Sequence, residues 1–391
     1  MNRARAKSAV LILGAFGTFG GRITNALSQT TTLPIVAAGR RVPASFAAQR
    51  QGVSALAIDA HDLNGALLQD LDAAVLIDAV GPFQGRDRKL AETCIAQGIH
   101  YIDLADGREF VQSVGRLNAA ALQHDVLVVS GASTLPALSS AVIKHLEGAF
   151  SAIEEIEIGV APGSLGPRGL ATIRAVLGYV GRPMPIWRAS AMAQARGWTE
   201  TTRHRYPPPV GARLLSLIDV PDTCLLPAAY PTLQRLAVRA GYEVAVVHHT
   251  LCFLGQLVRL GLIRDLPHHA LRLQRLAAWF DGLGSDNGAM HVQVRGRDAN
   301  GQPQCRTWTL VAERGDGPQI PATAAVLLAK KLLRVAGYAP IAARGAVPAV
   351  NLVSLTEFER EWRALAIHTS LTTDTSPAAH GSLKGPAHRA P

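Results

Sequence analysis

Three glycines in a short interval constrain this chain more than any other feature. Gly14, Gly17 and Gly20 follow the apolar run at residues 9–13 and open an amphipathic segment at residues 18–27. A strand that turns on glycine into a helix leaves unpaired backbone N–H groups at the helix start, and these donors favour a phosphate. Gly14 would allow the tight turn, Gly17 the approach of a pyrophosphate, and Gly20 close packing of helix and strand. A tight turn without a ligand is the alternative interpretation.

The residues after the next two strands suggest which dinucleotide would bind. The second strand, at residues 34–38, ends in Gly39-Arg40-Arg41. A carboxylate at this point often holds the ribose of NAD, whereas an arginine suits the 2′-phosphate of NADP. Arg40 therefore favours NADP, although NAD remains open and Arg40 could be a solvated strand-end side chain. Asp59 closes the third strand, where it could contact adenine or serve only as a turn residue.

Strand and helix signals alternate over the first part of the chain. Six apolar strands separated by helical segments predict an α/β fold with a doubly wound parallel sheet, its ligand at the carboxyl ends of the strands. We assign residues 1–134 to this domain. Residues 135–367 predict a second, α+β domain with a mostly antiparallel sheet, with strands at 153–158, 290–297 and 306–313 and a helical insertion at about 214–283. Residues 368–391 have the composition of a disordered tail.

Composition limits the classes of partner. The chain has 391 residues and a formal net charge of +10, but its basic residues are dispersed, which argues against a nucleic-acid arm and favours anionic ligands. Four widely separated cysteines fit neither a zinc site nor a disulfide framework. Adjacent histidines such as His248-His249 would point apart on a helix, so we expect no metal site.

No apolar run reaches the roughly 18 residues that span a bilayer. The apolar run near the N-terminus leads into the glycine turn and carries no small-residue cleavage site after it. We therefore expect a cytoplasmic protein without an integral membrane segment.

Candidate site residues follow the fourth and fifth strands. Gly81, Pro82 and Phe83 come at the sheet edge where nicotinamide would lie, or else form an ordinary turn. Tyr101 and Asp106 lie in and after the fifth strand and are the candidates for a general acid, although Asp106 could merely cap the next helix.

One candidate substrate contact comes from the second domain. Arg168 follows a Pro/Gly turn and opens a helix, so it could bind a substrate carboxylate or remain a solvated turn residue.

These motifs, taken in order, resemble the saccharopine dehydrogenase-like oxidoreductases. The matching segments are Gly14-Ala15-Phe16-Gly17-Thr18-Phe19-Gly20, Ala38-Gly39-Arg40, Val80-Gly81-Pro82-Phe83, Tyr101-Ile102-Asp103-Leu104-Ala105-Asp106 and Ser130-Gly131-Ala132. The resemblance implies an N-terminal NAD(P)-binding Rossmann domain, a split α+β substrate domain, and reversible reduction of an imine or carbonyl. It implies that Phe16, Thr18 and Phe19 lie with the three glycines at the cofactor. No position aligns with a catalytic acid or base of a true saccharopine enzyme, so lysine metabolism is not implied.

We therefore predict an NADP(H)-preferring oxidoreductase of this type. The substrate would be a small, for example amino-acid-like, molecule, and a homodimer is a candidate assembly. Two other classes remain open. The chain could be a non-catalytic nucleotide-binding sensor or scaffold, because no acid/base pair is recognisable. It could also be a peripheral membrane protein that uses the helical segment at residues 257–276.

Overall fold

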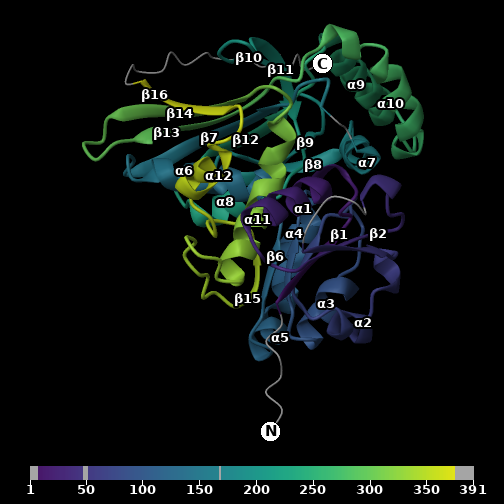
Figure 1. The fold of residues 1–391 in the computed structure, drawn as a ribbon. Helices are drawn as coiled ribbons and strands as arrows, with labels where there is room; N and C mark the ends of the chain where they lie inside the picture. The colour runs from purple at the N-terminus through teal and green to yellow at the C-terminus, as the bar shows by residue number, and fades with distance from the viewer. Residues whose placement is uncertain (1–7, 47–51, 167–168, 375–391) are drawn as a thin grey trace, which may run out of the picture.

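Two sheets and the helices between them make up the protein. The computed structural model describes residues 8–46, 52–166 and 169–374. Figure 1 shows the two sheets with the helix α11 (Ile320–Leu332) running between them.

The first sheet has seven strands, all parallel, in the order β15-β6-β5-β4-β1-β2-β3. Its strands are β1 (Ala9–Leu13), β2 (Ile35–Gly39), β3 (Val53–Ala57), β4 (Ala73–Asp78), β5 (His100–Asp103), β6 (Leu127–Ser130) and β15 (Gly345–Pro348). The strand order reverses between β1 and β4, which is where ligands bind in such sheets. The predicted doubly wound Rossmann sheet is thereby confirmed.

Helices cover both faces of this sheet because its central strands are apolar on both sides. One face packs on α2 (Gly65–Asp70), α3 (Lys89–Ala96) and α5 (Asn118–Gln123). The other packs on α1 (Thr18–Thr30) and α11, which also contact each other. The short helix α4 (Arg108–Gln112) follows β5 at the carboxyl edge.

The second sheet has nine strands and is mostly antiparallel, as predicted. Its order is β10-β11-β12-β7-β13-β14-β16, with β8 paired to β12 and β9 paired to β8. Its strands are β7 (Ala152–Ala161), β8 (Pro183–Arg188), β9 (Ala191–Arg196), β10 (Thr202–Arg205), β11 (Ala212–Leu217), β12 (Arg235–Ala240), β13 (Gly288–Arg297), β14 (Pro303–Ala312) and β16 (Ile367–Asp374). Only β7 and β12 pair in parallel among these neighbours.

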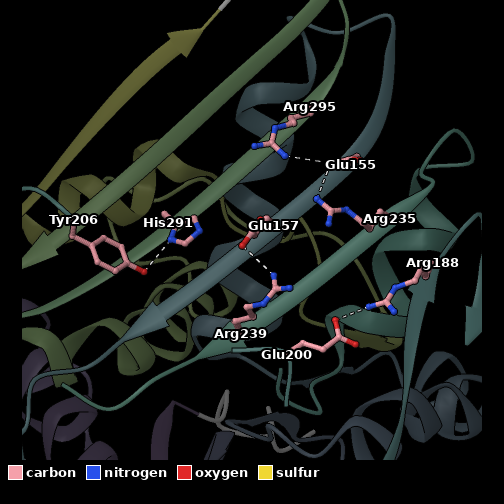
Figure 2. Close-up of polar contacts among 9 residues, drawn as sticks. All are labelled: Glu155, Glu157, Arg188, Glu200, Tyr206, Arg235, Arg239, His291 and Arg295. Carbon is pink, nitrogen blue, oxygen red and sulfur yellow. Dashed lines mark hydrogen bonds and ion pairs between the residues drawn. The ribbon is translucent and has the colours of Figure 1, made fainter. Parts of the chain in front are cut away.

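The two faces of this sheet differ sharply. One face is apolar and joins the core with α6 (Ser139–Glu147), α8 (Asp222–Ala229), α11 and α12 (Leu355–Trp362). The other face carries a ladder of charges, shown in Figure 2: Glu155 pairs with Arg235 at 2.9 Å and Arg295 at 3.3 Å, and Glu157 pairs with Arg239 at 3.0 Å. Alternation along β7 therefore separates an apolar from a polar face.

Helix α11 lies in the shared core. Nearly all of its side chains are buried, including Lys330 and Lys331. The ammonium of Lys330 lies 2.8 Å from Glu361 of α12 and 2.9 Å from the hydroxyl of Tyr338, and Lys331 lies 2.7 Å from Glu357. Buried lysines of this kind need such partners. A capping box of Ser354 and Glu357 opens α12.

Three remaining helical segments complete the second domain. Helix α7 (Leu170–Tyr179) lies at the boundary between the domains. Helices α9 (Ala245–Arg259) and α10 (Ala270–Ala278) form a pair at the periphery, which Figure 1 shows beyond α7.

Two predictions about the second domain are wrong. The segment at residues 214–283 is not a helical insertion, because it contains most of β11 and all of β12 beside α8, α9 and α10. β11 and β12 have only six residues each, and the leucines and arginines of the segment favour helix. Residues 368–374 are not disordered, because they pair with β14 as the edge strand β16. The threonines there favour strand, and a neighbouring edge was available. Residues 375–391 lie outside the described part.

The boundary of the first domain also needs correction. The predicted domain ended at residue 134, but β15 returns from the C-terminal part of the chain to pair with β6, Gly345 opposite Leu127. Sequence spacing could not reveal this because a strand that returns across about 200 residues leaves no local signal.

Candidate functional site

The glycine turn opens α1 at the carboxyl edge of the parallel sheet. Gly14 has φ +72°, a conformation that side chains rarely adopt, and Gly17 precedes the helix without a side-chain cap. No acidic residue occupies the first turn of α1. The backbone N–H groups there are therefore available to an anion.

Gly17 and Gly20 have different roles. A β-carbon on Gly20 would lie 2.2 Å from the carbonyl oxygen of Gly14, so Gly20 is needed for packing. A β-carbon on Gly17 would meet only that same oxygen, at 3.2 Å, and Gly17 is exposed. A side chain at Gly17 would be tight against this backbone oxygen alone, so the other space beside Gly17 is open to a ligand. The neighbouring Phe16 and Phe19 are half-buried against the core, and Thr18 begins the helix.

The ends of β2 and β3 lie beside this turn. Arg40 is exposed directly after β2 and forms no ion pair within the part of the chain that the structure describes. The ring of Phe16 covers Gly39, since a β-carbon on Gly39 would approach it to 2.8 Å, and Phe16 packs edge-on against Phe46 at 4.9 Å between centroids. Asp59 accepts a hydrogen bond from the backbone N–H of His61, as a turn aspartate does.

A buried carboxylate holds the loop after β4. Asp78 is fully buried, accepts hydrogen bonds from Val80 N–H and the Tyr101 hydroxyl at 3.0 and 3.1 Å, and pairs with Arg86 at 2.8 Å. Arg86 also donates to the carbonyl of Val80 at 2.7 Å. Sequence reasoning missed Arg86 and Asp78, although both flank the Gly-Pro motif that it singled out.

This network gives Tyr101 a structural role. Its side chain is 2% exposed and its hydroxyl donates to Asp78. Burial raises the pKa of Tyr101 well above its ordinary value, and the nearby carboxylates raise it further. Tyr101 therefore points into the domain, away from a position where it could protonate a substrate.

The loop at residues 81–84 faces the second domain. A β-carbon on Gly81 would contact Ala171 of α7 at 3.6 Å, and Pro82 is exposed. The Phe83 side chain is buried and packs against Phe110, with 5.4 Å between the ring centroids. Gly81 and Pro82 thus line the boundary between the domains, whereas the ring of Phe83 is buried within the first domain and anchors the loop there.

Asp106 lies at this boundary and does not cap the following helix. The residue before α4 is Gly107, and no side chain caps that helix. Asp106 is half-buried and accepts a hydrogen bond from the amide of Gln84 at 3.1 Å. Burial raises the pKa of its carboxyl, and the Gln84 hydrogen bond opposes this shift. A carboxyl of this kind retains its proton to higher pH than an exposed one.

The second domain supplies the facing side chains. Arg108 of α4 forms a two-pronged pair with Asp219, at 2.6 and 3.4 Å, and so connects the domains. Tyr179, near the end of α7, has its pKa raised by burial and then by the charge of Asp106. Neither Asp219 nor Tyr179 stood out in the sequence, because neither belongs to a local motif. Arg168 lies outside the described residues.

A second buried carboxylate, Asp103, organises the end of β5. One of its oxygens accepts three hydrogen bonds, from Ala105 N–H, Ser130 hydroxyl and Gly131 N–H, at 2.8–3.0 Å. The other oxygen has no partner. Burial raises the pKa of Asp103 to about 7, with the hydrogen bonds opposing this effect.

Two absences are findings of the structure within the described residues. No cluster of three His, Cys, Asp or Glu side chains there is arranged to hold a metal ion. No helix there is both long and apolar enough to cross a membrane.

The structure comprises a Rossmann-type α/β domain joined to an α+β domain. The glycine turn, with its uncapped backbone N–H groups, lies at the carboxyl edge of the first sheet. Residues 10–147 match the family model described as the saccharopine dehydrogenase NADP binding domain. The resemblance seen in the sequence is thereby confirmed. Among curated proteins, none matches the chain.

Solved structures show how far the fold is shared. The apo histidine-tagged saccharopine dehydrogenase (L-Glu forming) from Saccharomyces cerevisiae is 13% identical, with 93% of this chain and 100% of that chain covered at a TM-score of 0.63. The overall fold is therefore common to both. Amine dehydrogenase from Mycobacterium smegmatis is 10% identical over 88% of this chain and 96% of that chain, with a TM-score of 0.46.

The buried carboxyl of Asp103 generates a prediction about stability and pH. Its pKa of about 7 in the folded protein lies above the ordinary aspartate value of 3.8, so its favourable contribution is complete at low pH and is lost as the pH rises through 7. Asp103→Asn keeps the accepting oxygen but cannot ionise. Relative to this variant, the wild type should lose about 3 kcal/mol of unfolding free energy between about pH 5 and about pH 8.

Urea unfolding of both proteins across this range is the measurement. Buried histidines act in the opposite direction, since burial lowers the pKa of His100 and His248 to about 4. They contribute equally to both proteins, so the difference between the two curves isolates Asp103. Parallel pH profiles would show that Asp103 is ionised in the folded protein throughout.

Proposed function

We propose that this protein is an NADP(H)-dependent oxidoreductase acting on an imine or carbonyl of a small substrate. The observation that carries the proposal is the uncapped start of α1, with open space at Gly17, beside a half-buried carboxyl at the same sheet edge. A dinucleotide phosphate suits the first feature and a proton-transfer step suits the second. The family of residues 10–147 supports the cofactor class.

The chain's own residues fit such a cofactor. Gly14, Gly17 and Gly20 would hold the pyrophosphate against α1, and the exposed Arg40 would hold the ribose 2′-phosphate. Asp59, which follows β3, would lie at the adenine, and its side chain already accepts a hydrogen bond from the His61 N–H. Gly81 and Pro82 would flank the nicotinamide, which when bound supplies or accepts the hydride.

Asp106 is the residue to which we assign proton transfer. It lies between the loop at residues 81–84 and the second domain, and Gln84 orients its carboxyl. The raised pKa of its carboxyl favours the protonated form, which could donate a proton to a developing amine or alkoxide. Tyr101, the other sequence candidate, is better described as a positioning residue because its hydroxyl is held by Asp78.

The wall opposite this carboxyl comes from α7 and from the segment around Asp219. Ala171 faces Gly81, while Arg108 and Asp219 connect the two sides. A substrate enclosed there would be shielded from water on both sides, as hydride transfer requires.

The first prediction of the proposed function concerns phosphate binding at the glycine turn. Gly17→Val fills the open space beside α1, so NADPH binding should be abolished while the protein stays folded. Calorimetry with NADPH and circular dichroism are the measurements. Gly115→Val is the control, because a β-carbon there meets nothing within 4 Å. Unchanged NADPH affinity in Gly17→Val would place the cofactor elsewhere, and Gly20→Ala should impair folding itself.

The second prediction concerns cofactor preference. A charge-assisted contact from Arg40 is worth ~1.5–3 kcal/mol, so Arg40→Ala should weaken NADPH binding roughly 10- to 150-fold. NADH binding should barely change, and Arg41→Ala, at the adjacent exposed position, serves as the matched control. Equal losses for both dinucleotides would assign Arg40 a structural role, and a wild type that prefers NADH would refute the NADP assignment.

The third prediction concerns the acid. Asp106→Asn should lower turnover on the order of 10²- to 10⁴-fold and leave NADPH affinity within about twofold. Stopped-flow NADPH oxidation over a panel of imines and keto acids is the measurement. Asp87→Asn, an exposed carboxylate near the same loop, is the control. Full turnover in Asp106→Asn would remove this residue as the acid. A wild type that binds NADPH but turns over no member of the panel would favour the non-catalytic sensor.

A further inference from the structure

The α9–α10 pair exposes an unusual amount of apolar surface. Most of the large hydrophobic side chains that are exposed in the described residues belong to this pair and its flanking loops. Trp279 is 81% exposed, Leu262 70% and Phe253 62%. The others there are Val246, Leu260, Leu271, Leu276 and Leu283. Exposed apolar side chains concentrated on one pair of helices mark a candidate interaction surface.

The inner faces of the same helices explain why the pair is folded. Leu251, Leu266 and Ala270 are buried in a cluster with Leu177 and Val180, at the end of α7. This cluster uses only one side of α9 and α10. The exposed apolar side chains are therefore not needed to hold the helices in place, and their presence requires another explanation.

The positive charge on this surface indicates an anionic partner. Arg259, Arg264, Arg272 and Arg275 are all exposed, and none forms an ion pair within the described ranges. Exposed arginines interleaved with leucines and a tryptophan are typical of helices that lie on an anionic bilayer. Neither helix is long enough to cross one, since α9 has 15 residues and α10 has 9.

A cavity lies behind this surface, on the inner side of the pair, and shares Leu177 and Leu251 with the buried cluster. It has a volume of about 380 Å³ and lies between α7, α9 and α10, lined by Val176, Leu251, Leu254, Leu273 and Ala277 among others. At its rim, Leu165 and Leu276 are exposed. The volume is in the range of ligand sites, and the aliphatic lining suits a hydrocarbon chain.

We propose that the α9–α10 pair is the surface by which this protein binds a membrane containing anionic lipids. The arginines contact lipid headgroups, the exposed apolar side chains enter the interface, and the cavity accepts an acyl chain. The glycine turn and Asp106 take no part, so membrane binding is independent of the oxidoreductase activity proposed above.

Vesicle flotation of the full chain tests this proposal. The protein should float with vesicles of phosphatidylcholine and phosphatidylglycerol, less with phosphatidylcholine alone, and less at high salt. The double variant Arg272→Gln/Arg275→Gln removes two positive charges. Because each charge near an anionic surface contributes about 1 kcal/mol, the partitioning of the protein onto vesicles should weaken roughly 30-fold. Phe253→Ser/Trp279→Ser should abolish flotation. Met192→Ser/Leu371→Ser, which removes exposed apolar side chains elsewhere, should not.

Tryptophan fluorescence provides a second readout. Trp198, Trp308 and Trp362 are each 2% exposed. Trp187 is half-buried, and its indole N–H donates a hydrogen bond to the carbonyl of Leu233. Trp279 is therefore the tryptophan whose exposed surface a lipid bilayer could bury. Anionic vesicles should shift the emission to the blue, and Trp279→Phe should remove the shift.

Three results would overturn the proposal. The first is the absence of flotation with anionic vesicles, and the second is equal, salt-insensitive flotation with neutral ones. The third is self-association without lipid that Phe253→Ser/Trp279→Ser removes, because the surface would then be an interface between two copies of the chain. NADPH affinity should be unchanged in every variant, so failure here leaves the proposed activity untouched.

Discussion

The burial of α11 between the two sheets is the constraint on which the rest of the structure depends. Its side chains belong to one hydrophobic cluster that also contains residues of β1, β4, β7 and β13. A helix that is apolar around its circumference must be enclosed on all sides. The two sheets provide that enclosure, and so they share one core although the chain passes between them more than once. The two buried lysines are tolerated only because α12 and Tyr338 supply their partners.

Buried carboxylates fix the loops at the edge of the first sheet. Asp78 and Asp103 end neighbouring strands and accept hydrogen bonds from the backbone N–H groups two residues further on, those of Val80 and Ala105. The backbone of each loop is held by a side chain from its own strand, which leaves Gln84 and Asp106 facing the other domain. The candidate site is therefore built on loops that buried carboxylates hold in place, and these loops position Gln84 and Asp106.

Sequence reasoning found what local patterns encode and missed what depends on distant partners. The glycine turn and the strands of the parallel sheet are encoded locally, and the structure contains both. The edge strand β16 was missed because a threonine-rich segment becomes a strand only where β14 offers an edge. In the site, the sequence singled out Tyr101 by position, but the packing of β5 beside β4 turned its hydroxyl toward Asp78. Asp219 became a candidate only when folding brought it 2.6 Å from Arg108.

The pairing of Arg108 with Asp219 bears on how molecules enter and leave. Many two-domain proteins open by a hinge, in which one body swings away from the other as a unit. Here such a swing would separate a charge pair of which neither side chain is more than 20% exposed, and it would also expose the apolar surface of α11. Exchange of bound molecules should therefore occur by small local displacements of surface segments rather than by a wide opening of the whole protein. Its pace would be set by the short segments that border the entrance.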